Sequence, residues 1–175
     1  AQDELSINGW AMEARLYAED PAKGFLPSVG RLEHFDLGDE GRIETGVEEG
    51  DAISPYYDPM IAKLVATGDT RDEAIEALAS ILDEAEVWPV KTNAGFLFNA
   101  VLDEDFGAAR IDTGFIERKL DALVPDAEPD DALWRAAKLS RDNFGSCSAV
   151  IIITGMLMKR FSVFMKRTNS GPAIW

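Results

Sequence analysis

The sequence has almost none of the side chains that build disulfides, metal centres and nucleophilic triads. It contains one cysteine, Cys147, and one histidine, His34. A single cysteine excludes an intramolecular disulfide and a thiolate-based zinc site, which fits a reducing compartment such as the cytoplasm or the mitochondrial matrix. A histidine without a partner serine, cysteine or metal-ligating histidine is more typical of an ordinary strand residue than of a catalytic base.

Long apolar runs and a surplus of positive charge are also missing. The longest apolar run, residues 149–158, is well short of the roughly 20 residues that cross a bilayer. The formal net charge is -15, and an acidic protein is repelled by a nucleic-acid backbone. Residues 1–4 lack the basic region of a signal peptide, and no phosphate-cradling P-loop occurs. We therefore expect no membrane or nucleic-acid partner, and the absent initial methionine suggests a fragment.

The charge that is present changes sign along the chain. Up to Arg135 there are 31 acidic and 11 basic residues, whereas the remaining 40 residues carry 1 acidic and 6 basic ones. Residues 125–131 are acidic and contain proline, which is typical of a linker. We expect a domain over residues 1–124, an acidic linker over 125–131, and an irregular or helical extension of uncertain origin over 132–175.

Residues 10–18 alternate between apolar and polar side chains, as a half-buried strand requires. The apolar positions are Trp10, Met12, Ala14, Leu16 and Ala18, and the residues between them include Glu13, Arg15 and Tyr17. The pattern predicts a strand that is anchored by its apolar side chains and projects Arg15 from the face opposite the core.

The rest of the chain predicts strands followed by helices. Short strands are expected at residues 31–35, 42–47 and 60–67, separated by glycine-rich turns. Apolar residues recur at helical spacing over about 71–86, 93–102 and 114–123, and Asp69 and Thr70 are suited to cap the first helix. Because strands and helices do not alternate regularly, we predict an α+β fold, an antiparallel β meander with packed helices.

Several separated motifs give the chain a family resemblance. In order they are EARLYAEDP at residues 13–21, GFLPS at 24–28, SPYYDPMIAKL at 54–64, VKTN at 90–93 and DTGFI at 112–116. Over about residues 5–123 the sequence resembles the C-terminal part of biotin carboxylase, from the biotin-carrying alpha subunit of acyl-CoA carboxylases. The resemblance implies part of a ligase that carboxylates biotin with ATP and bicarbonate.

The resemblance also implies roles for individual residues. Arg15 matches the family's catalytic arginine, which contacts bicarbonate and stabilises the enolate form of biotin. A guanidinium stays charged and offers paired planar donors to such an oxyanion. Asp58 is a candidate to orient Arg15 as a supporting partner, and is equally suited to be a turn residue ahead of Pro59. Arg42 matches a position at the subunit interface of homodimeric members.

The resemblance implies that the other components of the reaction lie outside this chain. ATP and magnesium belong to missing lobes, and biotin belongs to a carrier domain. The expected partners are those lobes, the carrier domain and a carboxyltransferase subunit, so the isolated chain should be inactive. Glu13, Glu19 and Asp20 are not spaced to converge on a metal, and we predict no metal site here.

Some features depart from the family or leave alternatives open. Trp10 stands where many members have histidine, which hints at propionyl-CoA carboxylase. From about Lys138 onward we expect the resemblance to end. Lys159 and Lys166 follow methionines but lack the Met-Lys-Met pattern of a biotin attachment site. The alternative function is a noncatalytic subunit-interaction module that uses the Arg42 strand and the acidic surface.

Overall fold

The computed structural model describes residues 2–125, which belong to a compact unit spanning Ala1–Pro125. Our expectations for the linker, the extension, Cys147, Lys159 and Lys166 lie outside the described residues. The strands are β1 (Trp10–Tyr17), β2 (Glu19–Asp20), β3 (Leu26–Pro27), β4 (Gly30–Arg31), β5 (His34–Asp36), β6 (Arg42–Thr45), β7 (Ala52–Ile53), β8 (Met60–Gly68) and β9 (Glu86–Trp88). The helices are α1 (Arg71–Glu84), α2 (Ala94–Val101), α3 (Glu104–Gly107) and α4 (Phe115–Leu123), with 3-10 turns η1 (Gln2–Glu4) and η2 (Pro21–Lys23).

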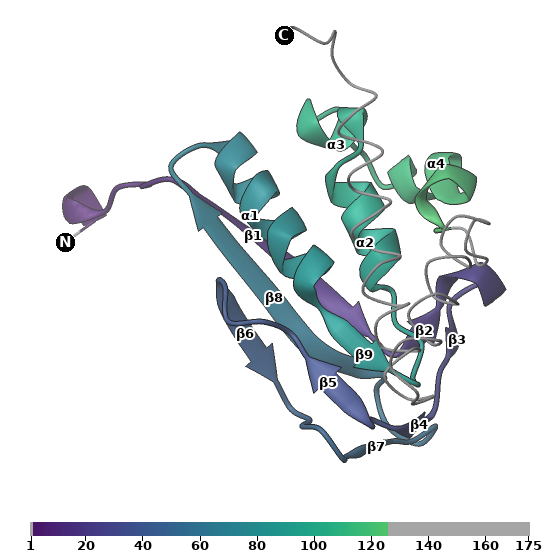
Figure 1. Ribbon diagram of the computed structural model, residues 1–175. Helices are drawn as coiled ribbons and strands as arrows, with labels where there is room; N and C mark the ends of the chain where they lie inside the picture. Colours follow the sequence, from purple (N-terminus) through teal and green to yellow (C-terminus); the bar gives the residue numbers. More distant parts are fainter. Residues whose placement is uncertain (1, 126–175) are drawn as a thin grey trace, which may run out of the picture. The chain divides into compact units, whose positions relative to one another are not determined.

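A three-stranded antiparallel sheet in the order β1-β8-β6 forms the centre of this unit. Helix α1 packs on one face of the sheet against β8 and β1, and α2 lies beside α1 (Figure 1). Residues 2–9 lead away from the start of β1, so the N-terminal turn stands apart from the sheet (Figure 1). The α+β class and the antiparallel pairing are as predicted.

The pairing of the short strands differs from a simple meander. The segments expected at 31–35 and 42–47 do not pair with each other. Instead β5 pairs with β9, and β6 pairs with β8. Gly41 permits the close approach of β6 to β8, because a Cβ atom there would lie 2.8 Å from the Val65 carbonyl oxygen. Only glycine permits that approach at its positive φ of 69°.

Helix α1 matches its prediction closely. The Thr70 side chain accepts a hydrogen bond from the Glu73 amide, and the Glu73 carboxylate accepts one from the Thr70 amide, which forms a capping box. The helix stops at Glu84 rather than Glu86, because Glu86 begins β9. Of the predicted apolar residues of α1, Ala74, Ile75, Leu78, Ile81 and Leu82 are buried, whereas Ala77 is only partly buried; Ala79, which was not predicted, is buried as well.

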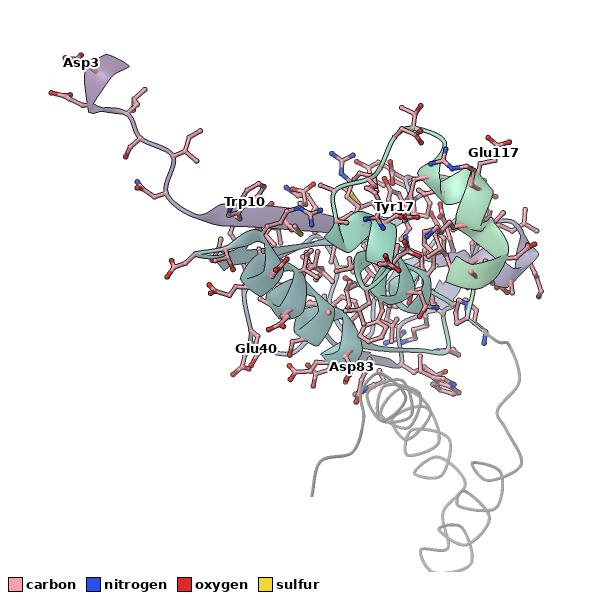
Figure 2. All side chains as sticks on the ribbon, turned by 90° about the horizontal axis from the view of Figure 1, so that it is seen from above. Asp3, Trp10, Tyr17, Glu40, Asp83 and Glu117 are labelled. Atoms are coloured by element: carbon pink, nitrogen blue, oxygen red, sulfur yellow. The ribbon has the colours of Figure 1, made fainter. Side chains whose placement is uncertain are left out.

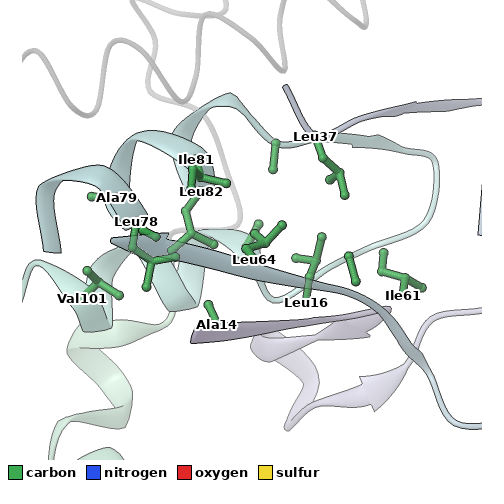
Figure 3. Close-up of a cluster of buried hydrophobic side chains, with 14 of the residues drawn as sticks. Ala14, Leu16, Leu37, Ile61, Leu64, Leu78, Ala79, Ile81, Leu82 and Val101 are labelled. Carbon is green, nitrogen blue, oxygen red and sulfur yellow. The ribbon is translucent and has the colours of Figure 1, made fainter. Parts of the chain in front are cut away.

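The main core fills the space between α1 and the sheet (Figure 3). Leu16 and Leu64 from neighbouring strands are fully buried, and the exposed fraction of Leu78 and Leu82 from α1 is at most 2%. Burying a leucine side chain stabilises a fold by about 1.5–3 kcal/mol. The core therefore fixes β1 firmly, and this strand carries the candidate site.

Helices α2, α3 and α4 build a second, smaller core. Phe96, Phe115 and Leu123 are buried together, and the Phe25 ring meets the Phe96 ring edge-on at 5.0 Å. Helices α2 and α4 confirm the predicted segments, whereas the four-residue α3 was not predicted. Within residues 2–125, no helix has the length and apolar character needed to span a membrane.

Candidate functional site

Arg15 projects from the open face of the central sheet, opposite α1. Its neighbours Ala14 and Leu16 point to the other face and are 6% and 0% exposed, because successive side chains of a strand alternate between faces. The Arg15 side chain is 61% exposed. Figure 2 marks the two ends of this strand by Trp10 and Tyr17. The predicted projection of Arg15 away from the core is confirmed.

The anchoring role predicted for Trp10 is wrong. Trp10 is 52% exposed, although it shares the alternation of Ala14 and Leu16. It pairs with Gly68, the last residue of β8, so it lies at the end of the sheet. There it is beyond the part of β1 that the main core covers, and alternation along a strand does not reveal where that cover ends.

The open face carries a row of charged side chains across all three strands. Lys63 of β8 lies opposite Arg15 of β1, and Glu44 of β6 lies opposite Lys63. In the next row, Val65 of β8 lies between Glu13 of β1 and Arg42 of β6. These rows gather three cations and two carboxylates on one face of an otherwise acidic unit.

Glu44 holds two of the cations. Its carboxylate forms ion pairs with Lys63 and with Arg42. Hydrogen bonds from Lys63, and then from Arg42, lower the pKa of Glu44 to about 2. The Lys63 ammonium is thus directed toward Glu44 on β6.

Arg15 is held less tightly. Its Nε donates to Glu13 Oε1 at 3.3 Å, and both side chains are largely exposed. This hydrogen bond, followed by one with the Tyr17 side chain, raises the pKa of Arg15 further, so the guanidinium is charged at any working pH. An exposed ion pair of this kind contributes little to the stability of the fold, so an anion can readily replace Glu13 as the partner of Arg15. The guanidinium is therefore available to an incoming anion.

Asp58 makes a turn rather than an ion pair with Arg15. Its Oδ1 accepts a hydrogen bond from the Met60 amide at 2.8 Å, which is the turn geometry we kept as the alternative. In residues 2–125 the ion pair of Arg15 is with Glu13. Asp58 instead approaches Glu19, whose pKa is raised by burial and then by the Asp58 charge. The expected Arg15–Asp58 pair is not formed in this structure.

The acidic residues near β1 do not converge. Glu13 pairs with Arg15, and Asp20 accepts from the Ala22 amide at the start of η2. Among the described residues, no group of three histidine, cysteine, aspartate or glutamate side chains is arranged to hold a metal ion. Figure 2 shows the labelled acids Asp3, Glu40, Asp83 and Glu117 on separate parts of the unit.

The remaining sequence candidates are His34 and Arg42. His34 is a strand residue of β5, and its Nε2 lies 2.9 Å from Glu86 Oε2 on β9. Arg42 is 73% exposed on β6, an edge strand of the central sheet. The structure therefore brings Arg42 onto the same open face as Arg15, two strands away.

Two residues beside Arg15 were missed by the sequence reasoning. Lys63 was not among the candidate residues, although it alternates with the buried Ala62 and Leu64 of β8. Asn93 was not a candidate either, and its side chain bonds to the backbone of Arg15 and Tyr17. Its separation of 76–78 residues from these partners leaves no local signal in the sequence.

The fold and the site define an antiparallel α+β domain that presents a charged arginine on the open face of its sheet. The family described as Biotin carboxylase C-terminal domain matches residues 13–118 of this chain. The chain therefore belongs to the biotin carboxylase C-terminal domain family, as the motifs indicated.

The relatives are subunits of larger carboxylases. The chain is 42% identical over 141 residues to the human mitochondrial propionyl-CoA carboxylase alpha chain, covering 78% of this chain and 19% of that one. It is 39% identical over 157 residues to the mitochondrial methylcrotonoyl-CoA carboxylase subunit alpha of Arabidopsis thaliana, covering 86% of this chain and 21% of that one. The chain thus spans about a fifth of the length of these relatives.

A solved structure shares the fold. The biotin carboxylase domain of Hydrogenobacter thermophilus 2-oxoglutarate carboxylase, in complex with MgADP and bicarbonate, superposes with a TM-score of 0.68 at 35% identity. The match covers 72% of this chain and 28% of that one.

The similarity to the Arabidopsis protein covers 86% of the 175 residues and so extends past Lys138. Our expectation that the resemblance ends at Lys138 is therefore wrong.

Proposed function

We propose that this chain is the biotin carboxylase C-terminal domain of a biotin-dependent acyl-CoA carboxylase and supplies Arg15 to the carboxylation of biotin. The observation that carries the proposal is the placement of Arg15: a charged guanidinium, exposed on the open face of a sheet whose other face is anchored in the core. A group held on a rigid strand keeps its geometry better than one on a loop. It suits a reaction in which negative charge develops on a small anion and on a ureido oxygen.

The arginine performs two tasks in this proposal. It holds bicarbonate by charge and paired hydrogen bonds, and it stabilises the negative charge on the ureido oxygen of biotin. Glu13 keeps the guanidinium near the strand until the anion arrives, because its hold on Arg15 is a single hydrogen bond. Lys63, tied to Glu44, adds positive charge beside Arg15. Asp58 is left out, because its carboxylate already closes its own turn.

The cofactors of this proposal bind largely elsewhere. Residues 2–125 contain no grouping suited to hold a metal, so ATP and magnesium are assigned to other lobes of the same enzyme. Biotin arrives on a carrier domain, and a carboxyltransferase subunit takes the carboxyl group onward. Arg42, exposed on an edge strand, is proposed as a contact between subunits. For a eukaryotic source we propose the mitochondrial matrix, since both named relatives are mitochondrial proteins.

Replacement of Arg15 in the complete carboxylase tests the proposal. Arg15→Ala should lower kcat for biotin carboxylation about a hundredfold or more, because an oxyanion-stabilising group is lost. Arg15→Lys should restore little of the rate, since an ammonium cannot offer two parallel donors. Arg118→Ala is the matched control: Arg118 is also an exposed, ion-paired arginine, but it pairs with Asp112 beside α4. The control should keep the normal rate.

An unchanged carboxylation rate in Arg15→Ala would overturn the catalytic assignment. The noncatalytic interaction module would then gain support. Arg42→Ala should shift the oligomeric state of the complete enzyme in size-exclusion chromatography, while Arg15→Ala should not.

A further inference from the structure

Asn93 is a buried polar residue with an unusual set of partners. It occupies the N-cap position of α2, where an asparagine side chain commonly bonds to the first free amides of the helix. Here the side chain makes no such bond, and Thr92 Oγ1 accepts from the Ala94 amide instead. Asn93 is only 7% exposed, so its amide group must find partners inside the protein.

Those partners are backbone groups of Arg15 and Tyr17, the residues on either side of Leu16. Asn93 Oδ1 accepts from the Tyr17 amide at 2.9 Å, and Nδ2 donates to the Arg15 carbonyl at 3.3 Å. The Asn93 amide also donates to the Tyr17 carbonyl at 3.2 Å. The oxygen of the side-chain amide thus faces a donor and its nitrogen faces an acceptor. In all, Asn93 makes three hydrogen bonds to a stretch of three residues in β1.

These bonds come where β1 is least supported by the sheet. β1 is an edge strand, so β8 pairs with it along one edge only. The register also shifts between Leu16 and Tyr17, where the strand skips a partner on β8. Arg15 and Tyr17 direct their backbone groups to the same edge, because alternate residues of a strand do so. Asn93 therefore takes the place of a neighbouring strand at the end of β1.

We propose that Asn93 is a positioning residue that fixes the backbone of Arg15 and thereby the direction of its guanidinium. The inference rests on the proposed function of Arg15. Asn93 touches neither the open face nor an anion bound there; it acts on β1 from the edge. A small displacement of a group that must meet a transition state can cost up to about a hundredfold in rate.

Hydrogen exchange in the full 175-residue chain tests the positioning without relying on catalysis. Asn93→Ala should speed exchange of the Tyr17 amide about tenfold or more relative to the amides of α1, because that amide loses its acceptor. Asn99→Ala is the matched control, an asparagine of the same helix whose Nδ2 donates to the Leu123 carbonyl. It should leave Tyr17 exchange unchanged, and equal effects of the two variants would overturn the inference.

Kinetics of the complete carboxylase give the second test, at a temperature where every variant is fully folded. Asn93→Ala should lower kcat for biotin carboxylation about tenfold to a hundredfold. It should leave KM for ATP within about twofold, because the variant does not alter the binding of ATP in the ground state. Asn99→Ala should keep both values. A normal kcat in Asn93→Ala, with Arg15→Ala inactive, overturns the positioning role alone; a normal rate in Arg15→Ala overturns the proposed function.

The Asn93→Asp variant supplies a rescue that a loss of packing would not show. Its ionised carboxylate still accepts from the Tyr17 amide but has no proton for the Arg15 carbonyl. Burial raises the pKa of such a group, and its protonated form can donate again. The rate of Asn93→Asp relative to the unmodified enzyme should therefore rise as the pH falls from 8 to 6 by about tenfold. A flat ratio would overturn the inference even where Asn93→Ala fails to fold.

Discussion

At the scale of single residues, the open face of the sheet depends on one carboxylate. Glu44 binds both Lys63 and Arg42, and without it three cations would face one another with only Glu13 between them. Lys63 and Arg15 stand on directly opposed strand positions, where like charges are unfavourable. Glu44 therefore reduces the repulsion among the cations around Arg15, which would otherwise destabilise the fold.

This role predicts how stability depends on pH. The folded-state pKa of Glu44 is lowered from an ordinary 4.5 to about 2. Its stabilising effect is therefore complete above about pH 4.5 and is lost as the pH falls toward 2. At pH 7 the urea midpoint of Glu44→Gln should lie below that of the unmodified chain. The difference should shrink as the pH falls from about 4.5 toward 2. Glu40→Gln, at an exposed residue, should match the unmodified chain, and a Glu44→Gln difference that is constant with pH would contradict the assignment.

At the scale of secondary-structure elements, α1 depends on its capping box. Thr70→Ala removes the acceptor of the Glu73 amide, a bond of 3.2 Å, at the start of the helix that covers the main core. We expect a loss of about 1 kcal/mol in the free energy of unfolding, measured by urea titration at pH 7. Thr113→Ala is the control, because Thr113 is exposed and precedes α4 without capping it. A loss within about 0.5 kcal/mol in both variants would show that the box contributes nothing.

The helices were predictable because their signals are local. Thr70, the acids of the first turn and the apolar spacing of α1 all lie within 16 residues of sequence. The partners of the strands were not, because β5 pairs with β9 about 50 residues away and no turn between them fixes the register. Hydrophobic periodicity identifies an extended segment and its buried face, but it does not identify the neighbour.

The candidate site divides in the same way. Alternation in β1 placed Arg15 on the open face, and the family motif gave its proposed role. The contacts that hold it were not accessible: Lys63 requires the pairing of β1 with β8, and Asn93 requires α2 to meet the edge of β1. Trp10 shows the converse limit, since its pattern is that of a buried residue while its position at the end of the sheet leaves it exposed.

At the scale of the whole described unit, the two cores are joined through α2. One face of α2 packs against α1, and the other packs against α4. Helix α4 is fastened by the buried Leu123 and by ion pairs from Lys119 to Asp103 and Asp105. Since Asn93 begins α2, the far helix supports the element that holds the Arg15 strand.

These connections predict how far toward the C-terminus a cooperative unit must extend. A chain that ends at Pro125 retains the contacts that Leu123 makes within residues 2–125 and should unfold in one transition, followed by circular dichroism during urea titration. A chain that ends at Arg118 loses Lys119 and Leu123, and should be less stable by at least about 2 kcal/mol, because burial of a leucine and its packing are lost. It should also show faster exchange of the Tyr17 amide, because α2 is weakened. Equal stability of the two chains would mean that α4 does not support α2, and that the second core is not coupled to the strand of Arg15.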